Sequence, residues 1–321
     1  MEVTTIGILG LNRIGASLAA ALQKTVPSKT IVGYDMDHGR AKDAVKAKLI
    51  DKMETNVGKV AAKADLLVML LPIHRRHDML ELIGSRVQEH VVILDMSPGK
   101  GQGLASAGKF IKEAHYVGVM PVLSAKWLED GREGLDLAQP DLFYNSVFCV
   151  MPDAKVDPQA VETAMNFGRL VGATPFFLDP LEYDGLAQGT TTLPSLVAAA
   201  MMNALAESQG WRDMLRFAGS GFALSTLALG QDADIATLAL ENREATLKWI
   251  DRFMEEMQTI RRLVHSGEPE QLVAMIEELN ETRVKWLRAR EKNEWNEDSL
   301  RNQVSGMSSA VNWFGSFGRG G

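Results

Sequence analysis

A glycine-containing stretch near the N-terminus constrains the fold of this chain more than any other feature of its sequence. The apolar run 3–9 predicts a buried strand, Gly10 ends it, and residues 14–22 predict a helix. Strand, glycine turn and helix form the opening of a dinucleotide-binding βαβ unit, whose helix N-terminus faces a pyrophosphate. Gly10 permits the tight turn and Gly15 lets the helix approach the strand, whereas Asn12 stands where the motif has its middle glycine.

The next strand and the residue after it support a dinucleotide site. Residues 30–34 predict that strand, and Asp35 follows twenty residues after Gly15. An acidic side chain at this spacing holds the 2′-hydroxyl of the adenosine ribose and repels a 2′-phosphate, which favours NAD over NADP as the cofactor. The alternative is that Asp35 caps the helix that follows. The residues expected to bind the cofactor are Gly10, Asn12, Arg13, Ile14, Gly15, Asp35, Leu71 and Pro72.

Composition limits the classes of partner. The chain has 321 residues, enough for two domains, and 46% of them are hydrophobic, which is sufficient for a large core. The net charge of −7 argues against nucleic acids and anionic membrane surfaces as partners but leaves an anionic small molecule open. Cys149 is the only cysteine, so no intrachain disulfide or cysteine-based metal cluster is expected. Neither a signal peptide nor an apolar run of about 18 residues is apparent, and we expect a cytoplasmic protein.

Strand and helix patterns alternate through the first half of the chain. Residues 64–71 form a continuous apolar run, which is typical of a strand in a parallel sheet covered on both faces. The glycine-rich segment 97–103 is expected to be a loop at the carboxyl end of a strand, where ligands bind in open α/β sheets. Further strands are predicted at 91–96, 116–120, 146–151 and 174–178, and helices at 40–49, 78–87, 105–114 and 158–170.

The alternation stops at Pro180, and only helical patterns follow. The Ala-rich segment 193–207 predicts a buried helix, and further helices are predicted at 211–218, 235–265 and 269–291. The change predicts a dinucleotide-binding domain at 1–180 and a helical substrate and dimerisation domain at 181–321 that ends in a flexible tail from Asn293. The expected fold class is α/β, with a doubly wound, Rossmann-type sheet followed by an all-helical domain.

The chain also carries a series of short motifs in a characteristic order and spacing. They lie at residues 8–18, 33–35, 94–96 with Lys100, 117–121, 138–143, 183–184, 193–194 and 210–218. Through them the chain resembles the prephenate/arogenate dehydrogenase family, over nearly its whole length to about Val264. The resemblance implies a Rossmann domain, a helical domain that forms a homodimer, and an active site between them under the nicotinamide. It further implies an oxidative decarboxylation of tyrosine biosynthesis, in which hydride leaves the carbon that bears a ring hydroxyl and carbon dioxide is released.

Three positions depart from the family's pattern. Met120 stands where the resemblance implies a histidine that accepts a hydrogen bond from the substrate hydroxyl, and Thr192 replaces a second active-site histidine. The family's serine in the loop after the 91–96 strand aligns with Pro98, beside Ser97. Neither a thioether nor a threonine hydroxyl accepts a proton near neutral pH, which indicates altered or reduced proton chemistry.

Two arginines in the helical half remain as the family has them. The resemblance implies that Arg216, with Arg212 nearby, meets a substrate carboxylate, a function suited to a guanidinium group. Arg216 can equally pair with Asp213 on the surface of its own helix, because residues three apart are neighbours there.

Other candidate residues also have a structural alternative. Lys100 is a candidate positive charge or proton donor, and Tyr183 is a candidate donor beside Asp184, which can instead cap the helix that follows. Residues 74–77 are predicted to begin a solvated helix, and none of the histidines has convincing metal-ligand spacing, so no metal site is expected. The candidate catalytic residues are Lys100, Tyr183, Thr192 and Ser97, and the candidate substrate-binding residues are Arg216, Arg212 and Met120.

Three functions remain open from the sequence. The first is an NAD-dependent oxidoreductase that acts on a small, cyclic hydroxy acid with a carboxylate, through altered or reduced chemistry. The second is a catalytically inactive homologue that binds a nucleotide or metabolite, which the missing histidines favour. The third, a β-hydroxyacid dehydrogenase, shares the two-domain plan but requires a lysine on the first long helix after the boundary, and residues 186–205 contain none.

Overall fold

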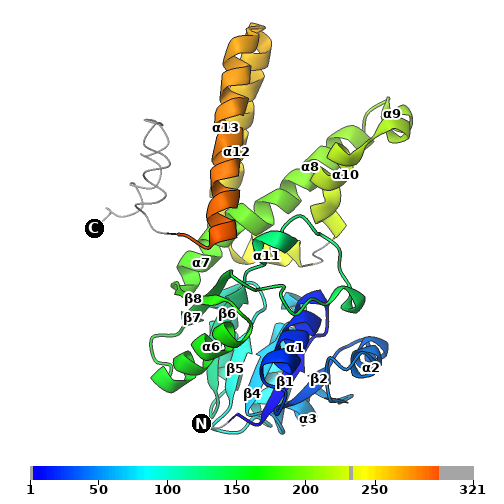
Figure 1. The fold of residues 1–321 in the computed structure, drawn as a ribbon. Helices are drawn as coiled ribbons and strands as arrows, with labels where there is room; N and C mark the ends of the chain where they lie inside the picture. The colour runs from blue at the N-terminus through cyan, green and yellow to red at the C-terminus, as the bar shows by residue number, and fades with distance from the viewer. Residues whose placement is uncertain (1–2, 231–233, 296–321) are drawn as a thin grey trace.

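A computed structural model describes residues 3–230 and 234–295 (Figure 1). Within them, eight strands form one sheet in the order β3-β2-β1-β4-β5-β6-β7-β8. The strands are β1 (Thr5–Leu9), β2 (Thr30–Tyr34), β3 (Lys52–Met53), β4 (Leu66–Met69), β5 (Val92–Asp95), β6 (His115–Pro121), β7 (Val147–Pro152) and β8 (Thr174–Phe177). The tail predicted to be flexible lies almost entirely outside the described residues.

The strand order confirms the doubly wound sheet predicted from the sequence. β1 lies between β2 and β4, and the described strands pair in parallel except for β6 and β7. In that antiparallel pair Met120 lies opposite Cys149. The two strands are joined by a connection that contains only short 3-10 turns, η1 (Ala125–Trp127) and η2 (Leu135–Leu137), because an antiparallel pair needs no helical crossover.

Helices cover both faces of the sheet, because successive strand residues point to opposite sides. α1 (Arg13–Thr25) and α6 (Pro158–Leu170) pack on one face, over a core that includes Ile8 and Phe148. α3 (Val57–Ala61), α4 (Ile73–Gly84) and α5 (Lys100–Phe110) cover the other face, over a core that includes Leu67 and Ile93. α2 (His38–Lys46) follows β2.

α5 begins earlier than the sequence predicts. Residues 97–103 are expected to be a loop, but the helix starts at Lys100. Gly99 precedes it with φ 74°, in the left-handed region that glycine adopts without steric cost. The connection after β5 therefore spans only residues 96–99, which holds Lys100 close to the carboxyl end of that strand.

The helical part begins with α7 (Pro180–Ala187), which continues through a π-helical turn, η3 (Gln188–Thr192), into α8 (Leu193–Ala206). The elements that follow are α9 (Trp211–Phe217), α10 (Ser220–Thr226), η4 (Leu227–Gly230), α11 (Ile235–Glu241), α12 (Arg243–Ser266) and α13 (Pro269–Lys292). The single helix predicted at 235–265 is thus broken at Asn242, whose φ of −113° and ψ of 41° lie outside the helical region. No helix of the described residues has both the length and the apolar composition to cross a membrane.

Two projections extend from the body of the molecule (Figure 1). α8, α9 and α10 form one, which we call the arm, and α12 and α13 form an antiparallel hairpin. The prediction that the 193–207 helix is buried is wrong for a single chain, because only Ser195 and Ala198 of α8 are buried. The apolar surface that motivated that prediction is left uncovered along the arm. The end of α13 returns to the sheet, where Arg290 Nη2 donates to the carbonyl of Leu123 at 2.8 Å.

Candidate functional site

The glycine turn after β1 has the geometry of a phosphate-binding turn. Gly10 has φ 100°, and a Cβ added there would lie 2.4 Å from the carbonyl oxygen of Leu70. A Cβ on Gly15 would lie 2.0 Å from the carbonyl oxygen of Gly10. A larger residue at either position is therefore excluded, and α1 starts in close contact with β1.

Asn12 is the N-cap of α1. Its side-chain oxygen accepts the backbone N–H of Gly15 at 3.0 Å. The N–H groups of Arg13 and Ile14 belong to the first turn, where a helix offers no internal acceptor. These two groups and the positive end of the helix dipole remain for an anion, so this turn fits a pyrophosphate without the middle glycine of the motif.

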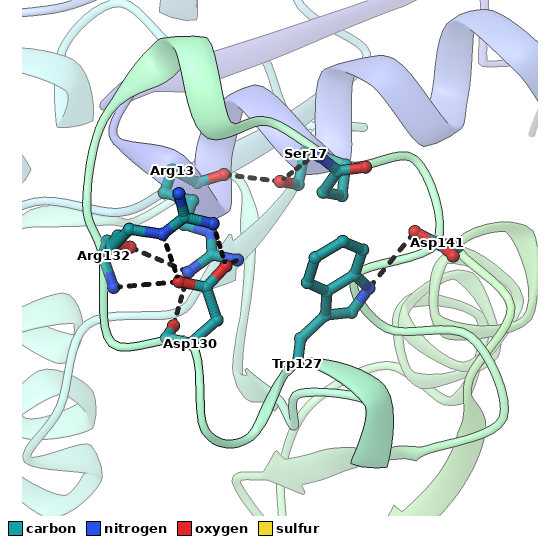
Figure 2. Close-up of polar contacts among 7 residues, drawn as sticks. Arg13, Ser17, Trp127, Asp130, Arg132 and Asp141 are labelled. Carbon is teal, nitrogen blue, oxygen red and sulfur yellow. Dashed lines mark hydrogen bonds and ion pairs between the residues drawn. The ribbon is translucent and has the colours of Figure 1, made fainter.

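The side chain of Arg13 does not extend toward that turn. Its Nη1 donates to the carbonyls of Asp130 at 2.6 Å and Arg132 at 2.8 Å, and its Nη2 pairs with the Asp130 carboxylate at 3.1 Å (Figure 2). On the same helix Ser17 Oγ accepts the backbone N–H of Gln139 at 3.0 Å. Arg13 therefore fastens the loop between β6 and β7 to α1, and only its backbone N–H remains for a cofactor.

Asp35 lies at the carboxyl end of β2 with 4% of its surface exposed. Its carboxylate accepts the backbone N–H groups of Leu11 at 2.7 Å and Asp37 at 2.8 Å, and Arg40 Nη1 approaches at 3.2 Å. The alternative that Asp35 caps the following helix is wrong, because Asp37 caps α2 through the N–H of Gly39 at 2.8 Å. Asp35 instead ties β2 to the glycine turn, at the position of a ribose-binding acid.

Lys100 is buried beside the ends of β5 and β6, with 1% of its surface exposed. Its ammonium donates to the carbonyls of Asp95 at 2.9 Å, Ser97 at 2.6 Å and Val119 at 2.8 Å. Burial lowers its pKa to about 8, which leaves it protonated at neutral pH. Because all three N–H bonds are directed at backbone carbonyls, this geometry supports a charge that links two strand ends and does not support a proton donor to substrate.

Asp184 connects the helical part to the nucleotide-binding part. Its two carboxylate oxygens accept the backbone N–H groups of Lys100 at 2.7 Å and Gly101 at 2.8 Å. It therefore caps α5 from α7, which carries it. The sequence alternative, in which Asp184 caps the helix that follows it, is wrong, because this carboxylate is used by a helix 84 residues earlier in the chain.

A buried charge cluster that the sequence did not indicate lies behind this loop. Asp95 is fully buried and accepts the N–H of Ser97 at 2.8 Å and the hydroxyl of Tyr116. Arg76 Nε lies 3.9 Å from the same carboxylate, and its Nη2 donates to the carbonyl of Pro98. The prediction that residues 74–77 are solvated is wrong for Arg76, which is 3% exposed. Its helical spacing from the buried Ile73 and Leu80 is the signal in the sequence that places it on the inward face.

The side chains beside Met120 are poor proton acceptors at neutral pH. Burial raises the pKa of the Cys149 thiol to about 11, which supports the expected buried, unreactive thiol. Burial also raises the pKa of Tyr183 well above that of a free tyrosine, so Tyr183 stays neutral and can donate but not accept a proton from a hydroxyl. The thioether of Met120 takes no proton either.

Two buried hydroxyls, one at the carboxyl end of β5 and one in the helical part, lack a hydrogen-bond partner among the described residues. They are Ser97 Oγ, after β5, and Thr192 Oγ1, in the π-helical turn η3, and each residue is 1% exposed. Buried polar groups are nearly always paired, and π-helical turns are frequent at functional sites. These two hydroxyls are therefore the groups best prepared to bond a polar ligand. The described residues contain no cluster of side chains suited to a metal ion.

Within one chain, the two arginines of α9 lie far from the carboxyl edge of the sheet. α9 lies at the far end of the arm, away from the sheet (Figure 1). The Arg216 side chain is 81% exposed and pairs with Asp213 at 3.3 Å, and Arg212 is exposed as well. The surface ion pair that the sequence allowed is formed, and Met120 and Arg216 of the same chain lie apart.

Comparisons with known proteins agree with this architecture. Models of the prephenate dehydrogenase nucleotide-binding domain and of the prephenate dehydrogenase dimerization domain match residues 18–176 and 179–278. The chain is 27% identical to a prephenate dehydrogenase of Bacillus subtilis over 272 residues, 84% of this chain and 72% of that protein. It is 20% identical to a cyclohexadienyl dehydrogenase of Zymomonas mobilis over 282 residues, 87% of this chain and 94% of that protein.

A solved structure shares the fold. It is the prephenate dehydrogenase from A. aeolicus in complex with hydroxyphenyl propionate and NAD+, with a TM-score of 0.77 and 22% identity over 89% of this chain and 99% of that chain. The resemblance inferred from the sequence motifs is confirmed by both domain matches. The chain, with its nucleotide-binding sheet and its helical arm, belongs to the prephenate dehydrogenase family.

Proposed function

We propose that this dehydrogenase oxidises prephenate, arogenate or a close cyclic hydroxy acid with NAD, and that its proton chemistry differs from the family's pattern. The observation that carries the proposal is the buried, unpartnered hydroxyl of Ser97 at the carboxyl edge of a sheet whose glycine turn fits a dinucleotide, together with a second such hydroxyl, that of Thr192, in the helical part. Ligands of open α/β sheets bind at this edge.

The residues that would hold NAD are already arranged for it. The backbone N–H groups of Arg13 and Ile14 would hold the pyrophosphate, and the Asp35 carboxylate would accept a hydrogen bond from the adenosine ribose. When bound, NAD supplies the acceptor for the hydride. A 2′-phosphate would meet the Asp35 carboxylate, although Arg40 beside it reduces the repulsion.

On the substrate side, the residues at the positions of the family's active-site motifs supply hydrogen bonds, and none of them is a base. Ser97 and Thr192 can bond the ring hydroxyl or a carboxylate, and Tyr183 can donate a further bond. Met120 offers only apolar contact where the family pattern has a histidine. We therefore expect prephenate oxidation at least about a hundredfold below that of members with the histidine, since a positioned base contributes ~10²–10⁴-fold. The same departures favour the second candidate, a homologue that binds ligands without catalysis.

Calorimetric titration followed by assay of NADH formation tests this function. We expect NAD to bind more tightly than NADP, and NADH to form slowly with prephenate or arogenate. Asp35→Ala should narrow the preference for NAD, whereas Asp37→Ala, which removes a neighbouring carboxylate that caps α2, should preserve it. Equal affinity of the wild-type chain for NAD and NADP would contradict the role of Asp35. Tight NAD binding without NADH formation from either substrate would favour the non-catalytic homologue.

We also propose a homodimer built on the arm. Large apolar side chains are exposed along it, among them Phe217 at 76% and Leu224 at 67%. Contiguous exposed apolar surface of this kind marks an interface. A two-fold dimer that buries the arm would also bring Arg216 of one chain toward the partner's substrate site, where a guanidinium suits a carboxylate.

Light scattering at micromolar concentration measures this association. We expect about twice the chain mass of 35.2 kDa. Phe217→Asp should shift the protein toward the monomer, because it places a charge in the buried interface. Leu82→Asp is the matched control, since Leu82 is 53% exposed on α4, away from the arm, and should remain dimeric. A monomeric wild-type protein at micromolar concentration would contradict the proposed homodimer.

A further inference from the structure

His74 and Asp234 form a close pair across the two parts of the chain. His74 lies in the first turn of α4, and its Nδ1 is 2.6 Å from Asp234 Oδ1. The other oxygen of Asp234 accepts the backbone N–H of Ile73 at 2.6 Å. Asp234 is buried, and the imidazole is about half exposed, at 53%. His74 is therefore exposed to solvent, as the sequence predicts, but it is also paired across the chain.

The pairing selects one form of the imidazole. An ionised carboxylate accepts hydrogen bonds only, so a neutral His74 carries its proton on Nδ1, and the lone pair is on Nε2. No hydrogen bond joins Nε2 to another of the described residues. A carboxylate that orients an imidazole and stabilises its protonated form is the arrangement that makes histidine a general base.

The pair lies beside the candidate site. α4 follows β4, and β4, β5 and β6 are consecutive in the sheet. Neighbouring strands lie about 4.8 Å apart, so the carboxyl ends of β4 and β6, on either side of β5, are separated by about 10 Å. α11, at the start of which Asp234 lies, contacts both α4 and the turn η3 that carries Thr192. The same helix, α11, therefore bridges the two elements that carry His74 and Thr192.

The other candidates for a proton acceptor at this site are unsuited to it. The three N–H bonds of Lys100 are directed at carbonyls, and Tyr183 and Cys149 stay protonated at neutral pH. The thioether of Met120 does not accept a proton near neutral pH. We propose that His74, oriented by Asp234, accepts the proton of the substrate hydroxyl. This inference rests on the proposed function.

In this step His74 holds the hydroxyl proton of the substrate and later returns it. As hydride leaves the carbon, its hydroxyl proton passes to Nε2 of His74 and the C–O bond becomes a carbonyl. The bond to the carboxylate then breaks, carbon dioxide leaves, and its electron pair enters the ring. The carbonyl oxygen takes the proton back from His74 and becomes a phenol. No net proton is consumed or released by the protein.

His74→Asn removes the proton acceptor but keeps the hydrogen bond to Asp234. The asparagine amide keeps a donor for Asp234 but has no basic nitrogen. We expect turnover with prephenate or arogenate to fall at least about tenfold, toward the ~10²–10⁴-fold contribution of a positioned base, while the dissociation constant for NAD changes less than about threefold. His77→Asn, one turn later on α4, is the control and should keep wild-type turnover. Unchanged turnover in His74→Asn would overturn the proposal, as would a loss explained entirely by weaker NAD binding.

A double-mutant cycle sharpens the assignment. In a Met120→His background a second base is present, so the loss caused by His74→Asn should shrink well below its value in the wild-type background. Equal losses in both backgrounds would show that His74 acts through structure and not through proton transfer.

Nitrogen-15 NMR of the imidazole tests the pair without any assay of turnover. We expect the neutral ring of His74 to carry its proton on Nδ1 in the wild type, and Asp234→Asn to weaken that preference. The opposite tautomer in the wild type would overturn the inference even if the enzyme is active. If the wild type forms no NADH from either substrate, the proposed function fails, and with it the catalytic role of His74, whatever tautomer the ring adopts.

Discussion

Lys100→Met is expected to lower the free energy of unfolding by about 3–5 kcal/mol, the range for removing one partner of a buried charged network. The substitution leaves the carbonyls of Asp95, Ser97 and Val119 without their donor and removes a positive charge next to the buried Asp95 carboxylate. Each unsatisfied buried polar group costs about 1–3 kcal/mol, so the loss of the donor to three carbonyls outweighs the gain from no longer burying a charge.

Urea denaturation with both midpoint and slope determined measures this effect. Lys109→Met is the matched control, because Lys109 is exposed in the last turn of the same helix, and such surface changes stay within about 0.5 kcal/mol. A destabilisation by Lys100→Met as small as that of the control would mean that the ammonium is not needed to join the ends of β5 and β6. The role of a proton donor to substrate, proposed from the sequence, would then regain support.

In the His74→Asn background, Met120→His is expected to raise turnover with prephenate by about 10²-fold, the lower end of what a positioned base contributes. A hundredfold change corresponds to about 2.7 kcal/mol of barrier, at about 1.4 kcal/mol per decade. Met120 lies near the carboxyl end of β6, opposite Cys149, at the position where the family pattern has its histidine. Substrate affinity should change less than turnover, because the other polar contacts remain.

Steady-state NADH formation with prephenate and with arogenate measures this change. Met120→Leu is the control: it keeps an apolar side chain of similar volume and should leave turnover unchanged. Adding Thr192→His to Met120→His should raise turnover further if the active-site pocket is otherwise intact. Wild-type turnover in the ordinary enzyme range of about 1–10³ per second, with no gain from Met120→His, would contradict the reduced chemistry and leave His74 as the sufficient base.

The nucleotide-binding half was largely predictable from the sequence. Residues 30–34 and 158–170 have the bounds that their patterns predicted, and Gly10 and Gly15 occupy positions that no larger residue can take. Asp35 lies where the spacing from Gly15 placed it. These features follow from periodicity, turn chemistry and motif spacing, which act over a few residues and are therefore written in the local sequence.

The polar contacts of the site were decided by the tertiary structure. The sequence left Lys100 open as a positive charge or a proton donor, and the structure directs its ammonium at backbone carbonyls such as that of Val119 on β6. Asp184 caps a helix that begins 84 residues earlier. His74 meets Asp234 across 160 residues, and Arg216 is carried away from its own chain's site by the arm. The motifs determined the family, the doubly wound sheet and the nucleotide turn. Which charges are buried, and with which partner, depended on how distant elements pack, because desolvation and pairing are set by neighbours in space and leave no periodic mark in the chain.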